Sequence, residues 1–157
     1  MEPPTNAPSF KNSAPAVDLE LEYIYGYRCF DTRQNVFWTN SGEVAYMAAA
    51  VGICLNTESN TQRFMGAGDS NTTKGHSDDI TALCIANDGN HIATGEVGKN
   101  PKIIVWEASN MTPKVEYRQG RGSRGVTALG FNKDMTLLAS CALDNDHTVR
   151  VWDQSGS

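Results

Sequence analysis

The sequence of 157 residues contains no apolar run long enough to cross a bilayer. Its longest run, residues 44–55, has 12 residues and includes Gly52 and four alanines, whereas a spanning helix needs about 18 or more. The first 15 residues also lack the basic and apolar regions of a secretory signal. We therefore expect no membrane span and a cytoplasmic location, with a longer precursor as the alternative.

Paired cysteines and an excess of positive charge are also missing. Cys29, Cys54, Cys84 and Cys141 form no CxxC or CxC pair, which excludes the common zinc and redox motifs and predicts buried, reduced thiols. Lys and Arg number 13 against 18 Asp and Glu, a net charge of -5. This balance argues against a surface that binds nucleic acid or an anionic membrane throughout, so we expect neither partner.

The hydrophobic pattern predicts an all-β chain that follows a flexible arm. Residues 1–17 contain four prolines and mostly small polar residues, which favours disorder. From residue 19 onward, apolar and polar residues alternate, which predicts a strand over residues 19–28 with one aromatic face. The side chains on that face are Leu19, Leu21, Tyr23, Tyr25 and Tyr27. Further strands are expected at residues 36–39, 44–48, 52–55 and 62–64.

An internal repeat is the strongest signal in the sequence. At an offset of 46, residues 80–106 align with residues 126–152 without a gap, and both copies contain T-A-L near the start and V-W at the end. A period of this length with short strands is typical of β-propeller blades. The expected strands are 80–85, 91–94, 102–106 and 114–118 in the first copy, and 126–131, 137–141 and 148–152 in the second.

Short motifs in these repeats resemble the WD40 family. Gly75-His76 occupies the place of its Gly-His dipeptide, and Trp106-Glu107 and Trp152-Asp153 occupy the place of its Trp-Asp pair. The resemblance implies an incomplete WD40-type propeller of about three blades. We expect five segments: an arm (1–17), a motif with degenerate blade strands (18–56), an outer strand with a polar loop (57–79), a blade (80–118) and a blade without its last strand (119–157).

The N-terminal part of the sequence resembles one particular family among WD40 proteins. Residues 19–56 contain Y-G-Y-R, D-x-R, G-E-V-x-Y and A-A-V-G in that order, and residues 93–101 read A-T-G-x-V-G-K-x-P. These strings resemble the HELP motif and the first WD repeat of the echinoderm microtubule-associated protein-like family. The resemblance implies a non-enzymatic protein that binds microtubules or tubulin in the cytoskeleton, with the ciliary axoneme as one setting. The alternative is a general WD40 scaffold that does not contact tubulin.

Some features depart from the family pattern. A polar loop is inserted at residues 68–74, no heptads precede residue 19, and the sequence ends just after the third strand of the last blade. We therefore expect an N-terminal fragment. Its unpaired edges should bind the rest of its own propeller or neighbouring proteins in an assembly.

The resemblance also implies two structural side-chain sets. In WD40 blades a His, a Ser or Thr, an Asp and the Trp can form a hydrogen-bonded chain. The corresponding residues are His76, Thr94, Asn100 and Trp106 in one blade, and Gly122, Ser140, Asp146 and Trp152 in the other, so neither set is complete. In the family the HELP segment packs between propellers, which implies a packing role for Tyr23, Tyr25 and Tyr27.

Catalytic, cofactor and metal sites are not expected. Residues 66–71 lack the third glycine of a dinucleotide loop, and residues 68–74 fail the Walker pattern. Residues 144–147 lack the Gly and Glu spacing of an EF-hand. His91 and His147 have no partner at metal-ligand spacing.

Positive charge is concentrated in one stretch. Residues 99–133 contain seven basic and two acidic residues. Because tubulin presents acidic surfaces, the partner contact is expected within this stretch at residues 118–124, and a solvated loop between blades is the alternative. The candidate contact residues are Lys99, Lys102, Lys114, Arg118, Arg121 and Arg124, with Lys133 at the end of the stretch.

Overall fold

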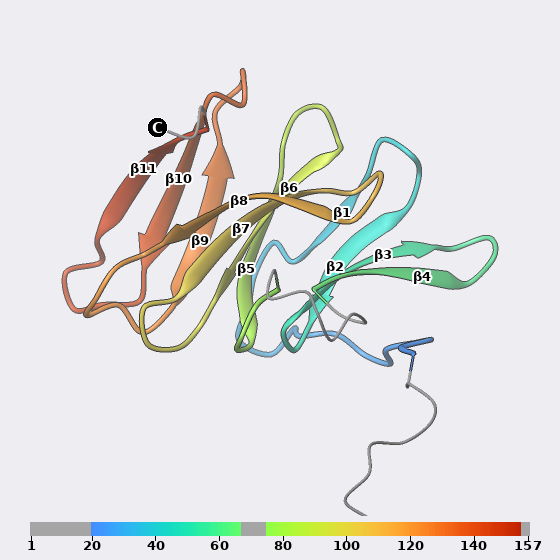
Figure 1. The fold of residues 1–157 in the computed structure, drawn as a ribbon, viewed down its shortest axis with the longest axis horizontal. Coiled ribbons are helices and arrows are strands. Elements are labelled where there is room, and N and C mark those ends of the chain that lie inside the picture. The colour runs from blue at the N-terminus through green and yellow to red at the C-terminus, as the bar shows by residue number, and fades with distance from the viewer. Residues whose placement is uncertain (1–19, 67–74, 155–157) are drawn as a thin grey trace, which may run out of the picture.

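Within the part of the chain that the structure describes, three antiparallel sheets follow one another (Figure 1). The computed structural model describes residues 20–66 and 75–154. Within these ranges every regular element is a strand, so the all-β prediction is confirmed, and no helix there is long and apolar enough to cross a membrane. The expected arm (1–17) and polar loop (68–74) lie outside the described residues.

Each sheet corresponds to one propeller blade. Blade 1 contains β1 (Val36–Trp38), β2 (Val44–Ala48), β3 (Val51–Asn56) and β4 (Thr61–Met65), in that spatial order. Blade 2 contains β5 (Ile80–Ile85), β6 (His91–Glu96), β7 (Lys102–Glu107) and β8 (Thr112–Arg118). Blade 3 contains β9 (Val126–Phe131), β10 (Leu137–Ala142) and β11 (Val149–Asp153). The strands predicted from residue 36 onward are confirmed to within two residues at each end.

Blade 2 is buried on both faces, which explains its nearly continuous apolar strands. Along β7, Ile104 and Trp106 face a cluster shared with blade 1, whereas Ile103 and Val105 face a cluster shared with blade 3. Successive side chains of a strand point to opposite faces, so a sandwiched sheet needs apolar residues at every position. Apolar packing against blades 1 and 3 therefore stabilises blade 2 on both of its faces.

Glycines allow the blades to pack closely. A Cβ atom on Gly52 of β3 would lie 2.9 Å from the Trp106 ring, and one on Gly95 of β6 would lie 2.6 Å from Val126 Cβ. Both distances are shorter than ordinary van der Waals contact. A large side chain of one blade thus fills the space left by a glycine of the neighbouring blade.

The strand predicted over residues 19–28 is wrong for the described part, because residues 20–29 have no strand conformation. Gly26 has a φ of +81°, which breaks an extended run. The Gln62 side chain takes the place of a strand partner: its amide accepts from Ile24 N at 2.7 Å and donates to Ile24 O at 2.9 Å. The alternating pattern therefore reflects a segment that lies along blade 1 without joining a sheet.

The prediction of buried thiols also needs correction. Cys54 and Cys84 are buried and Cys141 is half-buried, but Cys29 is exposed because it lies in the irregular segment before β1. Trp106 and Trp152 occupy equivalent register positions, opposite Ile92 and Leu138. Trp106 is fully buried, whereas Trp152 is only half-buried and stacks on Tyr117, with ring centroids 4.9 Å apart.

Candidate partner-binding surface

Three loops are joined at one end of blades 2 and 3. They are the β6–β7 loop (97–101), the β8–β9 loop (119–125) and the β10–β11 loop (143–148), and they lie together at the lower left of Figure 1. Gly98 N donates to Arg124 O at 2.9 Å, and Arg124 N donates to Leu143 O at 3.0 Å. We call this surface the three-loop platform. Its backbone hydrogen bonds fix the loops relative to one another.

Glycines shape the β8–β9 loop around its arginines. Gly120 and Gly122, on either side of Arg121, have φ values of +102° and +97°, a region that side-chain-bearing residues rarely adopt. The Arg121 side chain is exposed. A Cβ on Gly120 would lie 3.0 Å from an Nη atom of Arg150, so the Arg150 guanidinium from β11 lies directly over this loop.

Most cations of the platform have no carboxylate partner among the described residues. Lys102 Nζ donates to Gly75 O at 2.9 Å, and Arg124 Nη1 donates to Asn145 Oδ1 at 3.5 Å. Arg118 differs, because it forms an ion pair with Glu116 at 2.7 Å. The cations that form no ion pair within residues 20–66 and 75–154 are Lys99, Lys102, Arg121, Arg124 and Arg150.

Carboxylates near the platform are fewer. Asp144 accepts from Thr148 N at 2.9 Å, and this backbone bond is the main cause that lowers the pKa of Asp144. Asp146 is exposed in the same loop, and Asp78 lies beside Gly98. The platform therefore keeps an excess of positive charge.

The basic residues of the stretch 99–133 do not all lie on one surface. Lys114 lies near the start of β8 and Lys133 in the β9–β10 turn, both at the opposite end of the blades from the platform. Lys114 Nζ forms an ion pair with Glu107 Oε1 at 2.9 Å. The reason is geometric, because a β-strand rises about 3.3 Å per residue and thus carries its two ends to opposite sides of a blade.

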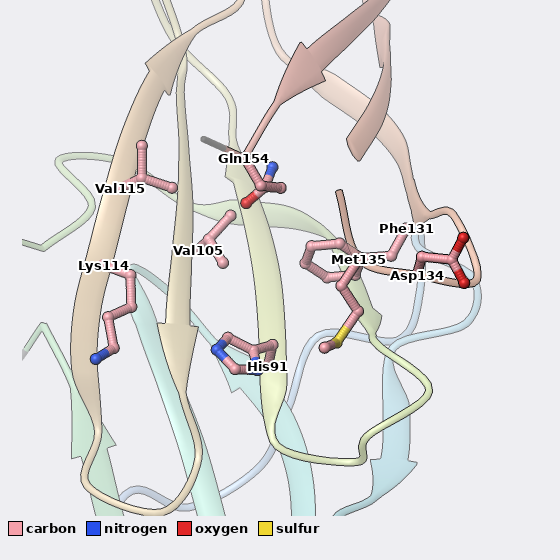
Figure 2. A pocket seen from close by; sticks show the side chains of 8 residues that line it. All are labelled: His91, Val105, Lys114, Val115, Phe131, Asp134, Met135 and Gln154. Carbon is pink, nitrogen blue, oxygen red and sulfur yellow. The ribbon is translucent and has the colours of Figure 1, made fainter. Parts of the chain in front are cut away.

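Lys114 lines a pocket of about 380 Å³ between blades 2 and 3. Its apolar lining comes from both blades, and Figure 2 shows Lys114 and Asp134 on opposite sides. His91 Nδ1 lies 2.5 Å from Asp88 Oδ2. The eight lining residues are His91, Val105, Lys114, Val115, Phe131, Asp134, Met135 and Gln154.

Blade 2 contains a buried polar network that differs from the predicted set. His76 Nε2 lies 2.8 Å from Thr94 Oγ1, and His76 Nδ1 donates to Glu96 Oε2 at 2.9 Å. The carboxylate of Glu96 also accepts from Ser77 N at 2.8 Å and from Lys102 N at 3.1 Å. Burial alone would raise the pKa of Glu96, but these hydrogen bonds outweigh it and lower the pKa to about 2.

Sequence comparison of the repeats gave no signal for Glu96, because the equivalent position in the second repeat is Ala142. The predicted members of the first set are only partly joined. Asn100 has a φ of +61° and its carbonyl accepts from Arg118 Nη1 at 3.4 Å. The Trp106 indole Nε1 is buried and has no hydrogen-bond partner among the described residues.

Blade 3 uses a glutamine where the repeat comparison pointed to a glycine. Trp152 Nε1 donates to Ser140 Oγ at 2.7 Å, and Ser140 Oγ donates to Gln119 Oε1 at 2.6 Å. Gln119 is 1% exposed. The offset of 46 aligns His76 with Gly122, three residues beyond Gln119. Asp146, the fourth predicted member, is exposed and lies outside this network.

The predicted tyrosine face has two exposed members. Tyr25 is 88% exposed and Tyr27 is 51% exposed, whereas Tyr23 OH donates to Asn60 Oδ1 at 3.1 Å. Their role in packing between propellers stays a prediction. Among residues 20–66 and 75–154, no group of three or more His, Cys, Asp or Glu side chains gathers as metal ligands do.

Comparisons with known proteins agree with this architecture. The HELP motif matches residues 14–53, and the WD domain, G-beta repeat matches residues 68–107 and 114–153. These two repeats cover more than half of the sequence. The chain belongs to the WD-repeat family.

Relatives of this WD-repeat chain are similar to it over nearly all of its length. It is 38% identical to "Ciliary WD repeat-containing protein ctxp80" of Euplotoides octocarinatus, over 94% of this chain and 22% of the relative. It is 33% identical to human "Echinoderm microtubule-associated protein-like 2", over 96% of this chain and 23% of the relative. Mouse "Echinoderm microtubule-associated protein-like 4" is 32% identical to it, over 94% of this chain and 15% of the relative. The predicted family resemblance is confirmed, and the chain spans about a fifth of these relatives' length.

Proposed function

We propose that this chain is a non-enzymatic, microtubule-associated WD-repeat protein that contacts tubulin through its three-loop platform. The names of its relatives support the microtubule association, because they describe microtubule-associated and ciliary WD repeat proteins. They equally support a structural rather than catalytic role and a location on the cytoskeleton, including cilia.

The platform is the observation that carries the tubulin contact. Lys99, Lys102, Arg121 and Arg124 belong to the predicted basic stretch, and none forms an ion pair with a described residue. An acidic protein surface would provide the missing partners. Such exposed charges act mainly by raising the encounter rate with a complementary surface, and salt screens them over about 8 Å at physiological ionic strength.

Co-sedimentation with taxol-stabilised microtubules tests the proposal. The chain should pellet with microtubules at low salt, pellet less at physiological salt, and stay in the supernatant without microtubules. Absence of pelleting at low salt would contradict the tubulin contact and favour the alternative, a WD40 scaffold that binds other proteins.

A further inference from the structure

The geometry of the three-loop platform points to a specific ligand chemistry. We propose that it binds an extended acidic peptide segment, rich in glutamate or aspartate, and that Arg150 is part of this site together with Arg121 and Arg124. This inference rests on the proposed function only in the choice of an acidic partner. It adds the conformation of the ligand and a residue outside the basic stretch.

Arg150 joins the site through the fold rather than through the sequence. It lies on β11, 26 positions after Arg124, yet its guanidinium lies over Gly120 of the β8–β9 loop, with Nη2 3.0 Å from the place of a Cβ. Gly120 has no Cβ and a φ of +102°. The guanidinium can therefore approach the backbone of the loop that carries Arg121 and Arg124.

Arginine is the side chain best suited to carboxylates. Its planar guanidinium can donate two parallel hydrogen bonds to one carboxylate. Arg121 makes no hydrogen bond or ion pair with any described residue, and Arg150 forms no ion pair with one. Like charges repel one another when no partner is bound, so a row of carboxylates would relieve the repulsion as well as supply hydrogen bonds.

The spacing of the arginines is compatible with an extended ligand. Arg121 and Arg124 are three residues apart, so their Cα atoms are separated by at most about 11 Å. Side chains on one face of an extended peptide recur about every 6.7 Å. Alternate carboxylates of such a peptide can therefore reach neighbouring arginines on a platform whose loops are fixed by backbone bonds such as Leu143 N to Gly125 O at 2.7 Å.

Binding of a fluorescent ten-residue glutamate peptide to the whole chain, followed by anisotropy at low ionic strength, tests the inference. A glutamine peptide of the same length is the uncharged probe. We expect binding of the glutamate peptide alone, and about five-fold weaker binding after Arg121→Gln or Arg150→Gln, as for a solvent-exposed charge pair of the stronger kind. Because the Arg121 side chain makes no hydrogen bond or ion pair with a described residue, we expect the Arg121→Gln variant to fold as the unmodified chain does.

Lys133→Gln is the matched control, because Lys133 is an exposed cation at the opposite end of the blades. It should bind the glutamate peptide as the unmodified chain does. An equal loss with Lys133→Gln and Arg150→Gln would overturn the inference, since only net charge would then matter. Equal binding of the glutamine peptide would also overturn it, and so would at least ten-fold preference for a phosphoserine peptide of matched charge.

This test and the microtubule test can fail separately. Glutamate-peptide binding without microtubule pelleting would refute the tubulin contact and leave the acidic-peptide site standing. Pelleting without glutamate-peptide binding would refute the acidic-peptide site and leave the microtubule association standing.

Discussion

Replacing Glu96 by Gln removes a buried charge while keeping the shape of the side chain. The Glu96 carboxylate accepts hydrogen bonds from His76, Ser77 and Lys102. A glutamine has one oxygen fewer, and its amide group would place a donor against these donors. A pKa lowered from 4.5 to about 2 corresponds to about 3 kcal/mol of folding stability at neutral pH.

The pH dependence follows from the direction of that shift. Because the folded-state pKa of Glu96 is depressed, its contribution is fully present above about 4.5 and is lost as the pH falls toward about 2. We expect Glu96→Gln to cost about 3 kcal/mol at pH 7, and about half of that at pH 3. At pH 3 the unmodified protein has already lost part of the stabilisation.

Urea unfolding at the two pH values, followed by tryptophan fluorescence, measures this difference. Glu58→Gln is the control, because Glu58 is exposed in the β3–β4 turn, and it should leave the free energy of unfolding unchanged at both pH values. A Glu96→Gln chain as stable as the unmodified one at pH 7 would refute the reasoning. A loss of stability that does not change between pH 7 and pH 3 would refute it as well.

Two further predictions concern packing and thiol reactivity. Gly52→Ala should destabilise the fold by about 1–3 kcal/mol because the added Cβ would overlap the Trp106 indole ring. Gly130→Ala is the control and should not destabilise the fold, because a Cβ there meets open space. Equal melting temperatures of the two variants would contradict this. Burial raises the pKa of the Cys54 and Cys84 thiols to about 12, so iodoacetamide at pH 8 should label exposed Cys29 before either of them, as mass spectrometry can show.

The blade strands could be predicted from sequence because two signals agree. The gapless repeat aligns Ile80 with Val126 and Trp106 with Trp152, and each copy shows apolar strands separated by turn residues. Register within a sheet follows from these patterns, since a slip of one residue would move a whole apolar face into water. Local pattern and tertiary packing therefore lead to the same strands.

The alternation of apolar and polar residues predicted a strand before β1 that the structure does not contain among residues 20–28. Residues 20–28 alternate as a strand does, but a strand also needs a neighbour with free backbone groups. Arg28 N donates a hydrogen bond to Met47 O at 3.3 Å, whereas the backbone of Ile24 forms hydrogen bonds with the Gln62 side chain. Such side-chain partners depend on the folded arrangement and leave no periodic trace in the sequence.

The candidate site was only partly predictable for the same reason. Adjacency in sequence grouped Lys114 with Arg121, although the length of β8 separates them. It left out Arg150, which the stacking of blade 3 on blade 2 brings to the platform. Gln119 was missed because the loop before β9 places it, and not Gly122, beside Ser140.

The most direct test of the tubulin contact reverses the charge of the platform. Arg118, Arg121 and Arg124 would be replaced together by Glu, and pelleting with taxol-stabilised microtubules would be measured at two salt concentrations. The account predicts a large loss of pelleting at low salt and a smaller difference at high salt, where the charges are screened in both proteins. Pelleting of the triple variant equal to that of the unmodified chain at low salt would contradict it.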